Sequence, residues 1–453
     1  MVFILATDGE TPDVLREFIM SKDNEITPDV VMKFIKKHQA KIPWYEISRK
    51  MYEGKHAILE REAREKFKPD NRLVVNMPKY IVDTFNGYFI GIPVKESHDD
   101  EGVHNFLKEF ARNNDLDNHE AELAKMTSIY GNAFEYMYQD ENANSMVVYN
   151  SPLDMFMVYD DTIHQGKLFA VRYTRDDKKR LFGEVITKTE RIEFKETDKG
   201  QLSFDNRELH HYIDVPVNEY IENEERFPVF ESVKTLCNAL NNALSAKADD
   251  VDYFADAYLV IKGASLDEDT MEQLRNNRTI NIAGEGTEDI VIEFLEKPSA
   301  DGTQENLIER LLDLIYQISM VANINDDKFG NSSGVAMEYK LQPMSNLAIM
   351  KERKFKSSFQ ERYRLLFSIP TNLPSVYKDE WRNIEYQFKR NLPRNTIEEV
   401  QTARDLEGIV SKETQLSRLS FVDDAKDEIK RMEAEEPQED DYDISLGEVA
   451  NER

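Results

Sequence analysis

The side chains of this sequence that could bind a metal ion or catalyse hydrolysis are its eight histidines and 87 acidic residues. Ligands for a metal must converge, and convergence usually appears in a sequence as short, fixed spacings. His98 and His104 are six residues apart, which does not align them on one helix. His210 and His211 are adjacent, so on a strand they would point to opposite faces. The spacing therefore predicts no histidine metal site. A metal-dependent nuclease or other hydrolase is the alternative function, but the sequence contains no ligands at the spacing that such an enzyme needs.

Three other segments contain residue types that can bind ligands. Ala283-Gly284-Glu285-Gly286 lacks a third glycine and a following helix, so it predicts a hairpin turn and not a dinucleotide site. Asp249-Asp250-Val251-Asp252 could bind a cation, but carboxylates without convergent partners usually form a solvated helix end. The single cysteine, Cys237, stands beside leucines at helical spacing, which indicates packing or an interface and not a nucleophile. No Walker-type phosphate loop is present, and we expect no cofactor.

The polar segment from Asn323 to Gly334 has the strongest functional signal. It joins two strongly patterned helices, where a connector of a few residues would be sufficient. Its only apolar residues are Ile324 and Phe329, and its glycines give the backbone freedom to move. A passive surface loop is the alternative. The candidate site residues in it are Asn325, Asp326, Asp327, Lys328, Phe329, Asn331, Ser332 and Ser333.

Two helices with continuous apolar stripes must position this segment. Apolar residues recur every three or four positions from about 228 to 254 and again from 305 to 322, which predicts one buried face on each helix. Between them lies an insertion, which we expect to contain a strand over 258–261, an acidic helix over 267–274, and a hairpin that pairs 279–282 with 290–294. An insertion this small cannot bury a core by itself, so we expect it to pack against other molecules.

The remaining chain divides into parts before and after these helices. We expect helices from Pro28, over 76–88 and over 118–131, followed by short strands that form an antiparallel sheet. A long helix is predicted from Val335 to Phe367, with a kink at Pro343. We expect its basic residues to form a face separate from its apolar one: Lys351, Lys354 and Arg362. After Asn391 the chain is helical and polar, and from Phe421 it is strongly acidic.

The composition limits the possible classes of protein. The 453 residues exceed what one core usually organises. The net charge of −29 argues against a protein that wraps nucleic acid, because wrapping depends on Lys and Arg that neutralise phosphates. It still permits a protein past which DNA slides. A single cysteine is typical of a reducing cytoplasm. The apolar run from Val2 to Leu5 is too short for a signal sequence, and no stretch reaches the roughly 20 apolar residues of a membrane span. We therefore expect a soluble cytoplasmic protein without membrane contact.

Three segments, in order along the chain, resemble portal proteins of long-tailed bacteriophages. The first is Asn71-Arg72-Leu73-Val74-Val75-Asn76-Met77-Pro78, which continues to Val94. The second is Tyr130-Gly131-Asn132-Ala133-Phe134-Glu135-Tyr136. The third is Gly330-Asn331-Ser332-Ser333-Gly334-Val335-Ala336-Met337-Glu338-Tyr339-Lys340. The resemblance extends over roughly residues 25 to 400.

This resemblance implies an α+β portal fold with a wing of helices and sheet, a two-helix stem, a small α/β clip, a long kinked helix and a helical crown. The implied parts are the wing at 1–228, stem helices at 229–254 and 305–322, the clip at 255–304, a tunnel loop at 323–334, the kinked wing helix and following segment at 335–394, and the crown with acidic tail at 395–453. The implied partner-binding residues of the clip are Asp267, Glu268, Asp269, Glu272, Arg275, Arg278 and Glu285.

The resemblance also implies a function. Portal proteins form a ring, usually a dodecamer, at one capsid vertex, through which double-stranded DNA is packaged and ejected. The implied partners are other copies of the chain, DNA, the terminase, a head-completion or adaptor protein, the scaffold and the major capsid protein. The implied location is the virion, with the host cytoplasm during assembly, and no enzymatic activity is expected. Another structural head protein, such as a scaffold or minor head protein, is the alternative.

Overall fold

The computed structural model describes residues 18–64, 68–255, 259–262, 291–294, 301–324, 334–391, 396–419, 421–422 and 425–435. They belong to two units, Met1–Arg390 and Asn391–Arg453. The first unit mixes helices with antiparallel sheets, and the described part of the second is helical. The predicted α+β class is confirmed at this level. None of the helices in the described ranges combines the length and low charge that a membrane-spanning helix requires.

Two of the N-terminal helices begin where the sequence predicts, after Thr27 and Asn76. Helix α2 (Pro28–Tyr52) starts after Thr27, whose hydroxyl accepts a hydrogen bond from the Val30 N–H at 3.4 Å. Helix α3 (Met77–Ile90) starts in the same way after Asn76, and α5 (Leu116–Tyr130) ends at Gly131. Helix α4 (Glu101–Asn114) was not predicted, although its first turn is capped by an aspartate and it buries one apolar stripe. Side-chain capping therefore sets the starts of α2, α3 and α4, whereas α5 starts after Asp115 without a side-chain cap.

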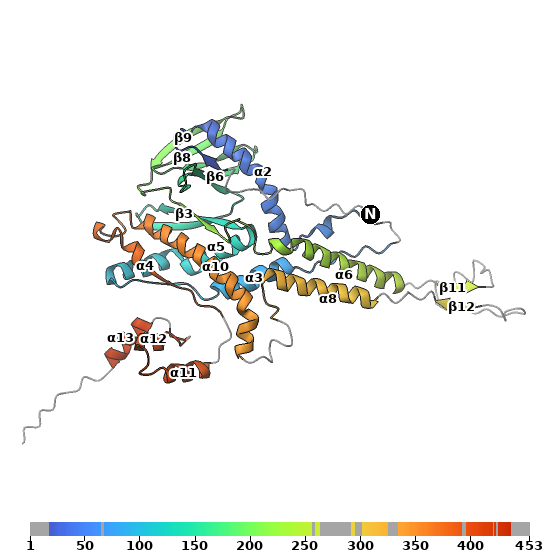
Figure 1. The fold of residues 1–453 in the computed structure, drawn as a ribbon. Helices are drawn as coiled ribbons and strands as arrows, with labels where there is room; N and C mark the ends of the chain where they lie inside the picture. Colours follow the sequence, from blue (N-terminus) through green and yellow to red (C-terminus); the bar gives the residue numbers. More distant parts are fainter. Residues whose placement is uncertain are drawn as a thin grey trace, which may run out of the picture. The chain divides into compact units, whose positions relative to one another are not determined.

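A six-stranded sheet follows the helices. Its order is β1 (Ile19–Met20), β5 (Met155–Asp160), β6 (Lys167–Arg175), β7 (Leu181–Ile186), β8 (Glu190–Glu196) and β9 (Leu202–Leu209). Strands β5 to β9 form an antiparallel meander, as predicted, while β1 pairs with β5 in parallel. Helix α2 lies across the sheet (Figure 1), because its apolar stripe of Val31, Phe34 and Ile35 packs on Phe169 and Phe194.

Two smaller sheets complete the body of this unit. Strand β3 (Asn132–Gln139) lies between β10 (Val217–Ile221) and β4 (Ser145–Asn150) in an antiparallel sheet. Strand β2 (Lys95–Ser97) pairs with β13 (Glu385–Gln387), so the segment after the last long helix returns to the N-terminal part. Short 3-10 turns occupy Ala57–Glu60, Glu231–Val233, Ser375–Tyr377 and Glu380–Asn383.

The two patterned helices are α6 (Lys234–Ala255) and α8 (Asp301–Ser319), which confirms the two predicted helices. Within the insertion between them, β11 (Leu259–Lys262) pairs antiparallel with β12 (Val291–Phe294). The predicted hairpin placed residues 279–282 opposite β12, but 279–282 lie outside the described residues. In the described residues β12 pairs with β11, the next described strand after α6, and the predicted pairing with 279–282 stays a prediction.

The long helix α10 (Gly334–Leu366) contains Pro343, and Figure 1 shows the helix changing direction part of the way along. The second unit contains the helices α11 (Thr396–Asp405), α12 (Lys412–Leu416) and α13 (Ala425–Glu435). Only Ala403 and Val422 are buried apolar residues among its described side chains. This unit therefore has very little core of its own.

Gly131 allows a direct test of this architecture. Its φ of +92° and a Cβ position only 1.8 Å from the Arg226 carbonyl oxygen leave no room for a side chain. We expect Gly131→Ala to lower the free energy of unfolding by at least about 2 kcal/mol. The matched control is Gly87→Ala at an exposed position of α3, where nothing lies within 4 Å of a Cβ. That change should stabilise the helix by about 0.5–1 kcal/mol. Urea unfolding of both variants tests the difference, and equal midpoints would contradict it.

Candidate functional site

Helices α6 and α8 lie side by side (Figure 1) and pack through apolar side chains. Leu240, Leu311 and Ile315 are buried in this part of the chain. Toward the end of the pair, Lys247 pairs with Glu305, and Gln304 donates a hydrogen bond to Asp250 at 2.8 Å. The pair is thus held by apolar contacts along its length and polar contacts at its far end.

Cys237 of α6 is fully buried, in agreement with the packing role predicted for it. Burial raises the pKa of its thiol to about 12, so the thiolate that a nucleophile requires is not formed near neutral pH.

The outer faces of the helix pair are unusual for a surface in water. Leu307 and Ile318 of α8 are 53% and 44% exposed, and Val251 of α6 is 63% exposed. Leu307, Leu314 and Ile318 share one side of α8, at the edge of the stripe whose buried members include Leu311 and Ile315. On α6 the exposed positions at helical spacing are uncharged and mostly small: Thr235, Ala239, Asn242 and Ala246. Exposed apolar residues that share one side of a helix, as Leu307 and Ile318 do on α8, are typical of protein interfaces.

A strap of extended backbone, residues 71–75, fixes α6 to the body of the unit. The N–H groups of Asn71, Leu73 and Val75 donate hydrogen bonds to side chains one turn apart on α6: Asp249 at 2.6 Å, Ser245 at 2.9 Å and Asn241 at 2.8 Å. Two residues of extended chain advance about 6.6 Å, and four residues of helix advance about 6.0 Å. The two repeats match, so every second N–H meets an acceptor. This strap belongs to the first of the three segments that resemble portal proteins.

The same contacts correct the interpretation of Asp249 as part of a solvated helix end. Asp249 is buried, and its carboxylate pairs with Arg64 at 2.7 Å and Arg61 at 3.7 Å. Asp252 accepts a hydrogen bond from the Asn71 side chain at 2.6 Å. Both carboxylates therefore attach the strap. No group of three His, Cys, Asp or Glu side chains in the described part of the chain is arranged to hold a metal ion.

Tyr80 of α3 fixes the chain where the candidate loop begins. Its hydroxyl donates to the Ala322 carbonyl at 3.0 Å and accepts from the Ile324 N–H at 3.0 Å. Its ring meets Tyr316 of α8 edge-on at 5.7 Å. The chain therefore leaves α8 at a defined place. The candidate loop residues Asn325, Asp326, Asp327, Lys328, Phe329, Asn331, Ser332 and Ser333 lie outside the described residues. So do the clip candidates Asp267, Glu268, Asp269, Glu272, Arg275, Arg278 and Glu285.

Beyond the loop, α10 is fixed by two buried cations, which corrects the predicted basic face. Lys351 and Arg362 are 1% and 0% exposed, and only Lys354 of the three predicted residues is on the surface, where it pairs with Glu224. The residues of the apolar stripe follow at spacings of three and four, and both buried cations are members of it: Met344, Ala348, Lys351, Phe355, Phe359, Arg362 and Leu366.

Lys351 lies in a pocket formed by α3, α5 and the chain after β10. Its Nζ pairs with Glu222 at 2.6 Å and donates to the Ser128 hydroxyl at 2.7 Å and the Ala124 carbonyl at 2.9 Å. Three phenylalanine rings surround it with centroids at 5.2–5.5 Å: Phe85, Phe89 and Phe355. Burial lowers the pKa of Lys351, while Glu222 opposes that shift.

Arg362 lies three helical turns further on, at the centre of a second buried network. It forms a two-pronged ion pair with Glu135 of β3, at 2.7 Å from Nη2 and 3.0 Å from Nε. Its Nη1 lies 2.6 Å from Glu120 of α5 and 3.9 Å from Glu96 of β2. His119 joins the network at 2.8 Å from Glu135. Sequence analysis did not identify these acidic residues. A glutamate between Phe134 and Tyr136 in an apolar strand was the available signal.

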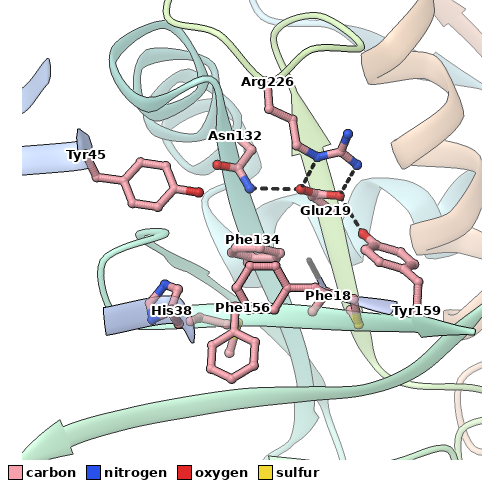
Figure 2. Close-up of a pocket in the computed structure, with 11 residues that line it drawn as sticks. Phe18, His38, Tyr45, Asn132, Phe134, Phe156, Tyr159, Glu219 and Arg226 are labelled. Carbon is pink, nitrogen blue, oxygen red and sulfur yellow. Dashed lines mark hydrogen bonds and ion pairs between the residues drawn. The ribbon is translucent and has the colours of Figure 1, made fainter. Parts of the chain in front are cut away.

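A third buried pair joins Glu219 of β10 to Arg226 in the chain that follows this strand. Figure 2 shows Glu219 between Asn132, Arg226 and Tyr159. Arg226 reaches its carboxylate through Nη2 at 2.7 Å and Nε at 2.8 Å, and Asn132 donates to it at 2.8 Å. Burial favours the neutral acid, but the Arg226 charge outweighs burial and lowers the pKa of Glu219. The protein itself satisfies this carboxylate, which indicates a structural role.

Asn241 tests the importance of the strap. We expect Asn241→Ala to lower the free energy of unfolding by about 1–3 kcal/mol, because it leaves the partly buried Val75 N–H without its acceptor. It also removes a hydrogen bond to His56. Asn242→Ala, on the exposed face of the same helix, is the control and should change stability by less than about 0.5 kcal/mol. Denaturant unfolding measures the stability of both variants. If Asn241→Ala destabilises the protein no more than Asn242→Ala does, the strap contributes little to stability.

Comparison with known proteins identifies the family of this chain. Residues 32–442 match the family described as phage portal protein, SPP1 Gp6-like. The portal protein of Bacillus phage SPP1 is 25% identical over 393 residues, which cover 81% of this chain and 76% of that protein. The portal protein of Clostridium phage phiCD119 is 21% identical over 384 residues, which cover 79% and 83%. Because the family match spans most of the sequence, this chain belongs to the SPP1 Gp6-like family of phage portal proteins.

Proposed function

We propose that copies of this chain assemble into a ring, a dodecamer, whose central channel passes double-stranded DNA during packaging and ejection. Members of this family are structural components of the virion and not enzymes, which agrees with the sequence expectation. The observation that carries the ring proposal is the exposed apolar surface of the firmly attached α6/α8 pair.

In this proposal the described elements take the following roles. Helices α6 and α8 are the stem, and the insertion 255–304 is the clip. The helices and sheets of 1–228, together with 335–394, form the wing, residues 323–334 are the tunnel loop, and 395–453 form the crown with its acidic tail. The small core of the C-terminal unit supports a crown that is completed by neighbouring copies.

The stem surfaces suggest how copies contact one another. One copy offers the apolar ridge of Leu307, Leu314 and Ile318 on α8. The exposed face of α6 in the next copy offers small side chains such as Ala239 and Ala246, which allow helices to approach within the usual 8–10 Å. Each α8 would then meet the α6 of a neighbour. A head-to-tail contact of this kind closes into a ring when the rotation per copy is suitable.

The charge of the chain is compatible with a channel that does not grip DNA. The net charge of −29 per copy repels phosphates at short range, and salt limits this repulsion to a Debye length of about 8 Å. Lys328 is the only cation of the loop 323–334 and offers one weak phosphate contact per copy. A strongly basic lining would release many counterions on binding and would slow translocation.

The proposed partners follow from these roles. The clip would dock the terminase during packaging and the head-completion or adaptor protein afterwards. The wing and crown would face the scaffold and the major capsid protein. The chain would assemble in the host cytoplasm and remain at the portal vertex of the capsid.

Electron microscopy of the purified protein tests the ring. We expect rings with a central hole for the wild type and a shift to monomers for Leu307→Asp and Ile318→Asp, because each places a charge in the proposed stem contact. Ile163→Asp is the matched control, since Ile163 is 97% exposed on the β5–β6 turn. Rings that persist in both stem variants would contradict this contact, and wild-type monomers would contradict the ring.

The tunnel loop can be tested independently of assembly. We expect Lys328→Ala to leave rings intact but to reduce packaged DNA, because one phosphate contact per copy is lost. Gly334→Val should have a similar effect by stiffening the entry into α10. Lys199→Ala in the β8–β9 turn is the control. An in vitro packaging assay that measures nuclease-protected DNA gives the answer: wild-type filling by both loop variants would indicate a passive loop.

A further inference from the structure

Three buried carboxylates share one guanidinium at the contact between α10, α5, β2 and β3. The side chains of Glu96, Glu120 and Glu135 are 9%, 5% and 0% exposed, and that of Arg362 is 0% exposed. If all three acids were ionised, two negative charges would lack an arginine or lysine counter-charge within the cluster. His119 is the remaining group that could offset one of them. Burial of uncompensated charge is strongly unfavourable, so the arrangement favours a neutral form of one acid.

The geometry identifies which acids compete. Glu135 occupies Nε and Nη2 of Arg362, and His119 also donates to it. Glu120 and Glu96 both approach the remaining nitrogen, Nη1, at 2.6 Å and 3.9 Å. Among the described residues, Oε1 of Glu96 has no hydrogen-bond partner, while its Oε2 accepts from the Tyr363 hydroxyl. A proton on either acid would reduce this crowding.

We propose that Glu96 and Glu120 share one exchangeable proton, and that this proton latches the C-terminal half of α10 onto β2 and α5. With the proton present, the cluster contains two carboxylates, one guanidinium and one histidine. Without it, a second carboxylate charge faces Nη1 in the interior, and the contact of α10 with the two elements becomes less stable.

Charged and titratable side chains from several elements surround this site in the described part of the chain, including Tyr149 of β4, whose ring centroid lies 5.6 Å from that of His119. Strand β2 contributes Glu96, β3 contributes Glu135, and β10 contributes Tyr220, whose hydroxyl donates to Glu135 at 3.1 Å. The other groups that face the two acids come from α5, α10 and β13: Asp117, His119, Glu120, Arg362, Tyr363 and Tyr386. Arg362 is the only arginine or lysine in this set.

The titration behaviour supports the geometric argument. Burial raises the pKa of Glu96 and Glu120 to about 7, against the opposing charge of Arg362. The folded protein therefore binds the proton more tightly than an unfolded chain does. Stability from the shared proton is fully present below the ordinary glutamate pKa and is lost as the pH rises through about 7. Glu135 behaves in the opposite way. The charge of Arg362 outweighs the effect of burial and lowers the pKa of Glu135 to about 2, so this carboxyl stays ionised between pH 6 and pH 8.

Hydrogen exchange of the full-length protein tests the latch. After correction for intrinsic exchange rates, we expect the protection of amides 351–366 to fall about tenfold between pH 6 and pH 8, as one proton with a pKa near 7 requires. The amides of α6 should not show this loss. In Glu120→Gln or Glu96→Gln, the protection of α10 should change less than about twofold between pH 6 and pH 8. The reason is that an uncharged amide replaces the titrating acid. Since the proton is shared, either substitution alone should be sufficient.

Glu224→Gln is the matched control. Glu224 also pairs with α10, through Lys354, but its side chain is 64% exposed, so the control should retain the wild-type tenfold loss. A second readout is the infrared band of a protonated carboxylic acid, which should be present at pH 6 in the wild type and absent from the double variant Glu96→Gln/Glu120→Gln. Equal pH dependence in the wild type and both single variants, or no such band at pH 6, would overturn the proposal.

Discussion

The structure depends first on the burial of Arg362 among acidic residues. A fully buried guanidinium that joins β2, β3 and α5 leaves three carboxylates without their common partner if it is removed, and such a loss typically costs about 3–5 kcal/mol. Lys351 provides a second fixed point three turns earlier on the same face of α10. Two charged anchors on one stripe prevent α10 from sliding along its groove, because a shift by one turn would separate both cations from their acceptors.

The loop 323–334 is thereby held between two fixed ends. On one side, the Tyr80 hydroxyl binds the backbone at Ala322 and Ile324, and the strap attaches α6 through three hydrogen bonds. On the other side, α10 buries Leu341 and Met344 before it reaches its first charged anchor at Lys351. Any adjustment of α10 next to the loop is therefore confined to its first turns, where Tyr339 is 76% exposed.

The interior and the outer surfaces of this chain show contrasting chemistry. The body pairs buried charges within the chain, as Glu219 with Arg226 and Glu222 with Lys351. The α6/α8 pair and the C-terminal unit leave apolar side chains such as Leu307, Ile318 and Phe421 exposed. Such exposure is unfavourable for an isolated copy and is relieved when copies associate. This contrast supports a rigid body whose remaining apolar surfaces become buried during assembly.

The sequence by itself determined the features that depend on near neighbours. Helix starts at Thr27-Pro28 and Asn76, the stripes of α6 and α8, and the antiparallel meander were all predictable, because caps and periodicities act over a few residues. The spacing also placed Lys351 and Arg362 on the apolar stripe of α10, yet their chemistry suggested a separate basic face. Only the tertiary structure decided that both are buried. Arg362 finds Glu120 and Glu135 at distances of 242 and 227 residues along the chain, and no local pattern encodes which distant carboxylate will neutralise a buried cation.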